Sequence, residues 1–104
     1  MAKKQYELRI LPLFENDLTE ITEYIAYRLH NLTAAEKLVD AVEKAIYERL
    51  PEAESFEPYR GIKERDFPYD WIEVNHFIVF YVVINSVMEV RRIIYRKRNM
   101  KRFL

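Results

Sequence analysis

The sequence lacks cysteine and has a single glycine, Gly61, among its 104 residues. Without thiols the chain can form neither a disulfide scaffold nor a thiolate zinc site, and it has no cysteine nucleophile. One glycine excludes a glycine-rich phosphate loop, and no set of His, Asp and Glu residues has metal-ligand spacing. We therefore expect neither a metal nor an organic cofactor.

Long apolar runs are also missing. No stretch approaches the length of a membrane span, and the N-terminal M-A-K-K-Q-Y lacks the apolar segment of a secretory signal. Half of the residues are nevertheless apolar and 14% are aromatic, which is enough to build a core in a chain of this length. We expect a single domain over residues 1–104, located in the cytoplasm and without membrane contact.

The net charge is zero, but acidic and basic residues are divided unevenly along the chain. Residues 1–57 carry 12 acidic and 7 basic side chains, whereas residues 58–104 carry 5 acidic and 10 basic ones. The densest basic segment has no acidic residue and contains Arg91, Arg92, Arg96, Lys97, Arg98, Lys101 and Arg102. Such a segment predicts a surface for a polyanion, either nucleic acid or an acidic part of a partner protein.

The periodicity of the first half predicts a strand and two helices. Residues 6–11 alternate polar and apolar side chains up to Pro12, which indicates a first strand, and a proline at its end suits either an edge position or the exit from the strand. Apolar residues at spacings of three and four then predict amphipathic helices over 15–30 and 33–50. Thr33 and Glu36 form a capping-box pattern at the start of the second helix. The short link predicts an antiparallel helical hairpin.

The second half predicts a loop and three strands. Residues 51–69 hold Gly61 and three of the four prolines, a composition typical of a loop. Strands are expected over 71–74, 77–84 and 87–95, with Asn85-Ser86 as the turn between the last two. The predicted class is α+β in the order β-α-α-β-β-β, with a three-stranded antiparallel sheet and the helical hairpin on one face.

This turn fixes which side chains share a face. Tyr81 would lie opposite Val90 and Phe80 opposite Arg91. We assign to the core face Val79, Tyr81, Val83, Met88, Val90 and Ile94, with Arg92 leaving at the sheet edge. The other face carries Ile78, Phe80, Val82, Ile84, Val87 and Ile93 beside Glu89, Arg91 and Tyr95. Because the helices cover only one face, we expect the second to be an open apolar patch for a protein partner.

The last two strands resemble a known family. The segment N-H-F-I-V-F-Y-V-V-I, a short turn and M-E-V-R-R-I-I-Y-R-K-R-N together resemble the C-terminal hairpin of the RelE/ParE superfamily, the toxins of bacterial type II toxin–antitoxin modules. The segments D-L-T-E-I-T-E-Y-I-A (residues 17–26) and A-A-E-K-L (residues 34–38) are similar to the family's helices, so the resemblance covers nearly the whole chain. It implies the β-α-α-β-β-β toxin fold and a cognate antitoxin that binds and neutralises the chain.

The resemblance implies one of two mechanisms. RelE-like members cleave mRNA on the ribosome with basic and acid–base side chains, whereas ParE-like members inhibit DNA gyrase and perform no chemistry. The arginine that ribonuclease members place in the hairpin falls at Ile78 here. The C-terminal tyrosine that some of them use has no equivalent here, where the last residues are Phe103-Leu104. The lysines that some members carry on the second strand match no basic residue in D-W-I-E-V. Only Arg98 matches a cleavage position, and Tyr95 lies near the place of a family histidine.

We predict ribosome-dependent mRNA cleavage, because phosphate contacts from a dense basic segment supply affinity for RNA. ParE-like inhibition of gyrase is the alternative, and a catalytically inactive binding module is a third. The catalytic candidates are Arg98, as a cation for the phosphate, Tyr95, as a proton shuttle, and His76, as a base. Packing for the tyrosine and a surface position for the histidine are the structural alternatives.

Two further surfaces complete the prediction. The first surface would contact the target, which is either the ribosome with its mRNA or gyrase. Its side chains are Arg91, Arg96, Lys97, Lys101, Arg102, Arg65 and Lys63. Arg65 and Lys63 can equally be interpreted as solvated loop residues. The residues expected to contact the antitoxin are Ile78, Phe80, Val82 and Arg91, with self-association as the alternative. Glu73 is either a base beside the cationic face or the ion-pair partner of Arg60 or Arg65.

Overall fold

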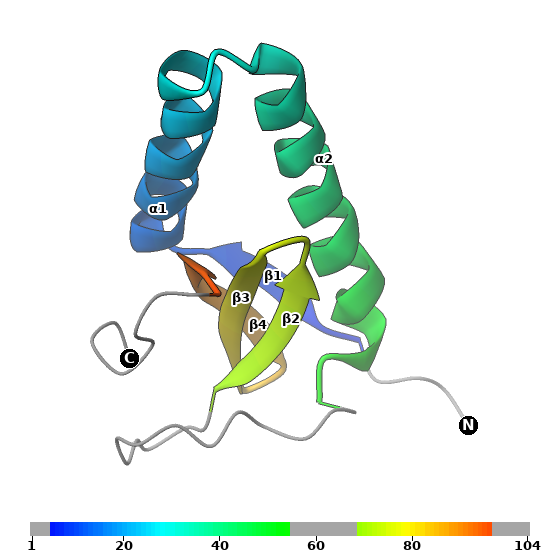
Figure 1. Cartoon of the computed structure of the whole chain (residues 1–104). Helices are drawn as coiled ribbons and strands as arrows, with labels where there is room; N and C mark the ends of the chain where they lie inside the picture. The colour runs from blue at the N-terminus through cyan, green and yellow to red at the C-terminus, as the bar shows by residue number, and fades with distance from the viewer. Residues whose placement is uncertain (1–4, 55–68, 97–104) are drawn as a thin grey trace.

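The computed structural model describes residues 5–54 and 69–96 (Figure 1). The elements are β1 (Glu7–Ile10), α1 (Pro12–Glu23) with a π-helical turn (Tyr24–Arg28), α2 (Leu32–Arg49) with a 3-10 turn (Leu50–Glu52), β2 (Asp70–Val74), β3 (Phe77–Ile84) and β4 (Val87–Tyr95). This order confirms the predicted β-α-α-β-β-β arrangement. The predictions for Lys63, Arg65, Lys97, Arg98, Lys101 and Arg102 fall outside the described ranges.

The strands form one sheet in the order β1-β4-β3-β2. β2, β3 and β4 are antiparallel as predicted, and β1 adds a parallel edge strand along the first half of β4. Asn85 and Ser86 make the predicted turn, with φ angles of 51° and 66°. Both angles lie in the left-handed region, which two-residue hairpin turns require. The sheet is therefore mixed, with its antiparallel part continuous in sequence.

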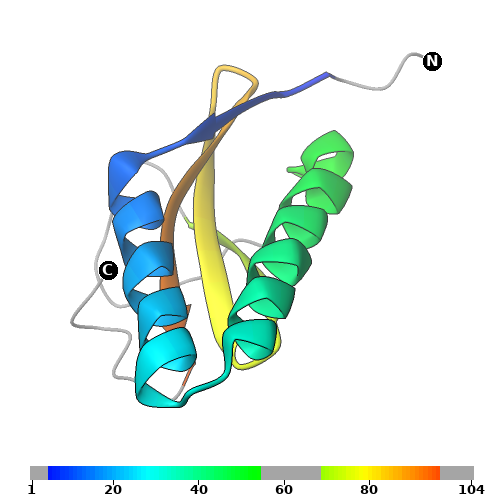
Figure 2. The ribbon, with the colours of Figure 1, turned by 90° about the horizontal axis from the view of Figure 1, so that it is seen from above.

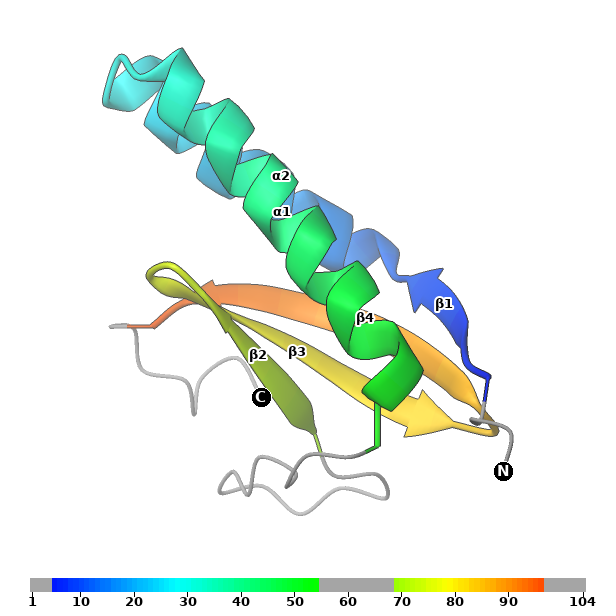
Figure 3. The ribbon, with the colours of Figure 1, turned by 90° about the vertical axis from the view of Figure 1, so that its right-hand side faces the viewer.

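Both helices lie on one face of the sheet (Figures 2 and 3). Pro12 occupies the first turn of α1, where a missing N–H costs little, so the helix begins three residues before the predicted start. The N-cap of α2 is Asn31, whose side-chain oxygen accepts a hydrogen bond from the backbone N of Ala34 at 3.0 Å. The predicted capping box at Thr33 is therefore wrong, because Asn31 starts the helix earlier. None of the described helices is long and apolar enough to cross a membrane.

The main core lies between the helices and the sheet. Phe14 of α1 and Val42 of α2 are buried against Val79, Tyr81 and Met88 of the sheet. Toward the link between them, the helices rise away from the sheet (Figure 3). The apolar positions in that part, which are Leu18 and Ile21 of α1 and Ile25 of the π-helical turn, are consequently only partly buried.

A β-bulge in β4 changes the predicted faces. Tyr81 pairs with Val90 as expected, but Phe80 pairs with Arg92, so Arg91 is an extra residue between two regular pairs. A slip of one residue reverses the side of every residue that follows it. Ile93 therefore belongs to the helix-side core, and Ile94 to the opposite face, the reverse of the predicted assignment.

The face opposite the helices carries a second apolar cluster. Ile78, Phe80 and Val82 are 6%, 0% and 1% exposed, and they pack together with Tyr69 and Ile94. The Tyr69 and Phe80 rings meet edge to face with centroids 5.8 Å apart. The prediction that these three side chains form an open patch is therefore wrong, because they are buried within the chain itself. Their contact with an antitoxin stays a prediction.

Candidate functional site

The C-terminal end of β4 lies beside the turn that joins β2 to β3. Phe77 pairs with Tyr95, and the backbone N of Arg96 donates to the carbonyl oxygen of His76 at 2.8 Å. Two of the three catalytic candidates, His76 and Tyr95, are therefore brought to the same end of the sheet. The third, Arg98, lies outside the described residues.

Packing accounts for the position of Tyr95. Its ring lies against that of Phe77, with centroids 5.6 Å apart and a tilt of 56°, and 37% of the residue is exposed. His76 is exposed in the turn, where Asn75 before it takes the left-handed φ of 55°. Within the described ranges, no hydrogen bond joins the two candidates. The catalytic roles of Tyr95 and His76 stay predictions.

Arg96 faces Glu73 across the sheet. Its Nη1 lies 3.2 Å from Oε2 of Glu73, and both side chains are about half exposed. Of the two interpretations of Glu73, an ion pair is the one observed among the described residues, with Arg96 as its partner, whereas Arg60 and Arg65 lie outside the described ranges. An exposed pair of this kind contributes little stability and opens readily, so the Arg96 guanidinium stays accessible to an anion.

Arg91, the bulge residue, is paired with Glu89. Its Nε and Nη2 both lie 2.8 Å from Oε1 of Glu89, and Nη1 of Arg9 on β1 lies 3.6 Å from Oε2. Burial lowers the pKa of Arg91, but hydrogen bonds with Glu89 and Tyr69 outweigh it, so the pKa is raised overall. The guanidinium therefore stays charged, with about one-third of its side chain exposed.

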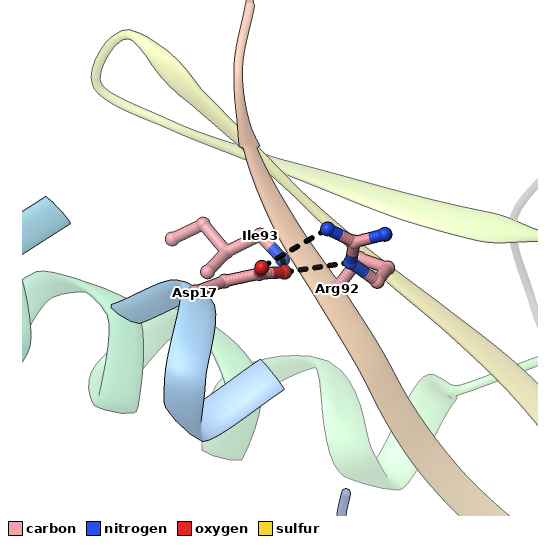
Figure 4. Close-up of polar contacts among 3 residues, drawn as sticks. All are labelled: Asp17, Arg92 and Ile93. Carbon is pink, nitrogen blue, oxygen red and sulfur yellow. Dashed lines mark hydrogen bonds and ion pairs between the residues drawn. The ribbon is translucent and has the colours of Figure 1, made fainter. Parts of the chain in front are cut away.

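Arg92 is held by α1 (Figure 4). Its Nε and Nη2 donate to Oδ2 and Oδ1 of Asp17 at 2.7 and 3.0 Å. The backbone N of Ile93 donates to the same Oδ2 at 3.2 Å. Because β1 pairs with β4 only as far as Val90, Asp17 supplies the acceptor that a strand partner would otherwise offer to Ile93. The hydrogen bond with Asp17 raises the pKa of Arg92 despite its burial.

The described part of the basic segment is thus compensated by carboxylates. Arg91, Arg92 and Arg96 face Glu89, Asp17 and Glu73, all of which lie outside the acid-free segment in sequence. Arg92 is the least exposed of the three, because both ends of its guanidinium contact are taken by Asp17. Arg96 is the most accessible of the three. Target binding by Arg91 and Arg96 stays a prediction, with Arg96 better placed for it.

A buried polar group, which the sequence does not predict, forms around the hydroxyl of Tyr81 near the middle of β3. The hydroxyl of Tyr81 donates to the carbonyl oxygen of Ala53 at 2.6 Å, and Arg49 Nη1 donates to that hydroxyl at 3.1 Å. The same nitrogen donates to the carbonyl oxygen of Trp71 at 3.0 Å. Tyr81 is fully buried, which raises the pKa of its hydroxyl. These bonds join the end of α2 to β2 and β3.

Asp70 lies beside this group, paired with Tyr81 across the two strands. It is only 7% exposed, and its Oδ1 has no hydrogen-bond partner among the residues that the structure describes. Burial raises the pKa of Asp70 to about 6, against the opposing effect of Arg49 and with a further rise from Glu54. In the described residues, no group of three or more His, Asp or Glu side chains could hold a metal ion.

Comparison with known proteins relates this arrangement to a family. The family model described as "ParE toxin of type II toxin-antitoxin system, parDE" matches residues 8–100. No curated protein matches significantly. A solved structure of the chromosomal ParDE TA system from P. aeruginosa is similar with a TM-score of 0.72 and 15% identity, over 88% of this chain and 96% of that one.

A second solved structure is more distant. The archaeal RelE-RelB complex from Pyrococcus horikoshii OT3 matches with a TM-score of 0.45 and 15% identity, over 92% of this chain and 100% of that one. At 15% identity, the similarity to the first structure shows a shared fold and nothing more. The TM-score of 0.45 for the second structure is too low to support an inference. The family assignment therefore depends on the match over residues 8–100.

Proposed function

The chain belongs to the ParE toxin family of type II toxin–antitoxin systems, and from that premise we propose that it arrests growth by inhibiting DNA gyrase without chemistry of its own. We also propose that a cognate antitoxin neutralises it. The observation that carries the proposal is the family match over residues 8–100, which spans both helices and nearly all of the sheet. Membership confirms the resemblance to the superfamily and favours the ParE-like alternative over the mRNA cleavage first predicted.

The geometry around the expected cleavage position supports the same choice. Where ribonuclease members carry an arginine, this chain has Ile78, which is 6% exposed and packed in the second apolar cluster. A buried isoleucine offers no charge to a scissile phosphate. Tyr95 packs against Phe77, and Arg92 is enclosed by Asp17. The described residues therefore present no assembled acid–base set.

The antitoxin contact is proposed on the face opposite the helices. Ile78, Phe80 and Val82 form its buried floor, and Arg91 is its accessible charged member. An acidic antitoxin segment that approached this face could replace Glu89 as the partner of Arg91. An arginine fork can bind such a carboxylate with two parallel hydrogen bonds, in place of the two contacts that now converge on Oε1 of Glu89.

Two assays test the proposed function. In cells that express the toxin alone, we expect the DNA-damage response to be induced while incorporation of labelled amino acids continues. With purified toxin and gyrase, we expect supercoiling activity to be lost, and to return when the small protein encoded by the neighbouring gene is added. Early loss of translation with cut mRNA would contradict the proposal and restore the nuclease interpretation. Normal growth of the expressing cells would contradict both.

A further inference from the structure

Exposed apolar side chains gather at the tip of the helical hairpin. In the described part of the chain, seven large apolar residues are exposed, and four of them lie between positions 24 and 32. These four are Tyr24, Tyr27, Leu29 and Leu32, with exposed fractions of 54%, 72%, 56% and 61%. Figures 1 and 3 show this end of the hairpin as the part farthest from the sheet. We call these four residues the hairpin tip.

The backbone at the tip departs from regular helix. The last turn of the first helix widens into a π-helical turn over Tyr24–Arg28, with the backbone N of Leu29 bonded to the carbonyl oxygen of Tyr24 at 3.1 Å. His30 then takes a φ of 52°, a conformation that glycine adopts at lower cost. Isolated π-helical turns are rare and occur frequently at functional sites. The unusual backbone and the exposed apolar side chains thus coincide within nine residues.

The charge around the tip limits what it can bind. Exposed charged residues of the hairpin comprise seven acidic and three basic side chains, which are Glu15, Glu20, Glu23, Glu36, Asp40, Glu43, Glu48, Arg28, Lys37 and Lys44. Glu20 and Glu23 lie one turn before Tyr24 and Tyr27. A surface of this sign repels nucleic acid and acidic protein segments. It complements an apolar pocket that has a basic rim.

The area of the tip argues against a second copy of the chain. Since an aromatic side chain buries 150–250 Å² when fully covered, the exposed fractions of Tyr24 and Tyr27 amount to roughly 250 Å², and the two smaller leucines add less than that. A stable symmetric dimer needs about 800 Å² from each partner. Joining two tips would also bring acidic side chains together. A small apolar projection fits better as an anchor in a pocket of a larger protein.

We propose that the hairpin tip is the surface by which this toxin engages its protein target, inserting Tyr24 and Tyr27 into an apolar pocket with a basic rim. This inference rests on the proposed function, because the target is taken to be gyrase. It separates the two binding events in space. The target is anchored at the tip of the hairpin, whatever further contact Arg96 makes with it, and the antitoxin binds the face of the sheet opposite the helices.

The test is a pair of glutamine substitutions with a matched control. Glutamine preserves helix propensity while removing the aromatic ring. Tyr24→Gln combined with Tyr27→Gln should raise the toxin concentration that halves gyrase activity at least about tenfold, the change expected when anchor residues are lost. Tyr47→Gln removes an equally exposed tyrosine (63%) from the far end of the same hairpin and should leave that concentration within about twofold. Thermal unfolding and binding of the antitoxin should be unchanged in both variants.

A folded double variant with wild-type potency would overturn the proposal. If the double variant fails to fold, a photo-crosslinking residue at position 27, with position 47 as the control, answers the same question. Crosslinks to the target from position 27 alone support the proposal, and equal crosslinks from both positions overturn it. If wild-type toxin arrests growth without inhibiting gyrase, the proposed function fails. Loss of growth arrest in the double variant would then still support the tip as the target-binding surface.

Discussion

Asp17 and Arg92 lie 75 residues apart in sequence and form a two-point ion pair, with Nε to Oδ2 at 2.7 Å and Nη2 to Oδ1 at 3.0 Å. The pair joins α1 to β4 just beyond the last residue that β1 covers. Because the same carboxylate also accepts from the backbone of Ile93, it closes an otherwise open edge of the sheet. The base of the hairpin is fixed there, while its tip projects from the sheet.

We predict that Asp17→Ala lowers the free energy of unfolding by about 2–4 kcal/mol. The change leaves a partly buried guanidinium and a backbone N–H without their acceptor. Chemical denaturation measures the loss. Arg92→Ala and the double variant complete a cycle whose coupling energy should be about 1–3 kcal/mol. Glu48→Ala, which removes an exposed pair with Lys44, should cost less than about 0.5 kcal/mol. A loss below 1 kcal/mol for Asp17→Ala would contradict the role of this pair.

Asp70 should make stability depend on pH. Its pKa is about 6 in the folded chain against an ordinary value of 3.8, so the folded state binds the proton more tightly than the unfolded state. The stability that the protonated carboxyl of Asp70 contributes is therefore fully present below pH 3.8 and is lost as the pH rises through about 6. A shift of about two pKa units corresponds to roughly 3 kcal/mol.

Asp70→Asn tests this dependence, since it removes the ionisation at nearly constant shape. The stability of Asp70→Asn relative to wild type should increase by roughly 2.5 kcal/mol between pH 4 and pH 7.5, because pH 4 already lies slightly above the ordinary pKa of 3.8. Asp40→Asn, at an exposed position of α2, controls for the loss of one charge and should show no comparable trend. A relative stability of Asp70→Asn that stays constant over this range would contradict a raised pKa of the buried carboxyl.

The hydroxyl of Tyr81 should contribute to stability through its two hydrogen bonds. Tyr81→Phe keeps the ring in the core but leaves the carbonyl oxygen of Ala53 without this donor, and we expect a loss of about 1–2 kcal/mol. Denaturant unfolding gives the value. Tyr47→Phe, at an exposed tyrosine, should be neutral. An effect of equal size in the two variants would show that the hydrogen bonds around Tyr81 carry no specific stabilisation.

The order of elements follows from the sequence because each signal is local. Alternation, helical spacing, Pro12 and the Asn85-Ser86 turn depend on neighbouring residues, and all four match the structure. The faces on which the side chains of β4 lie after Arg91 cannot be predicted from the sequence, because the bulge at Arg91 leaves no local signal. Its effect is to exchange the sides of Ile93 and Ile94. One inserted residue was enough to misplace everything after it.

The site was harder to predict for a related reason. The basic segment has no acid within it, and two of the three acids that face it come from other elements, while Glu89 precedes it on β4. Asp17 lies on α1 and Glu73 on β2, and only the assembled sheet brings them to Arg92 and Arg96. The burial of Ile78 and Phe80 was missed as well, because alternation assigns a residue to a face but does not show whether that face is covered.

Arg96 and Glu73 allow the role of charge to be separated from that of stability. Because the pair is half exposed, Arg96→Ala and Glu73→Ala should each change the free energy of unfolding by less than about 1 kcal/mol. If Arg96 contacts the target, Arg96→Ala should weaken growth arrest, whereas Glu73→Ala should leave it unchanged or strengthen it by freeing the cation. Equal loss of growth arrest in both variants would indicate that the pair acts only as a structural unit.

Substitutions of Tyr95 and His76 test whether the toxin acts by a catalytic mechanism. Tyr95→Phe removes only a hydroxyl and retains the ring contact with Phe77, and His76→Ala changes an exposed turn residue. If the toxin acts by binding gyrase, both variants should arrest growth within about twofold of wild type, because no proton is transferred. General acid–base groups typically contribute 10²–10⁴-fold to a rate, so a true catalytic role would be unmistakable. A hundredfold loss of toxicity in a folded variant that still binds antitoxin would therefore restore the nuclease mechanism, and cut mRNA in wild-type cells would accompany it.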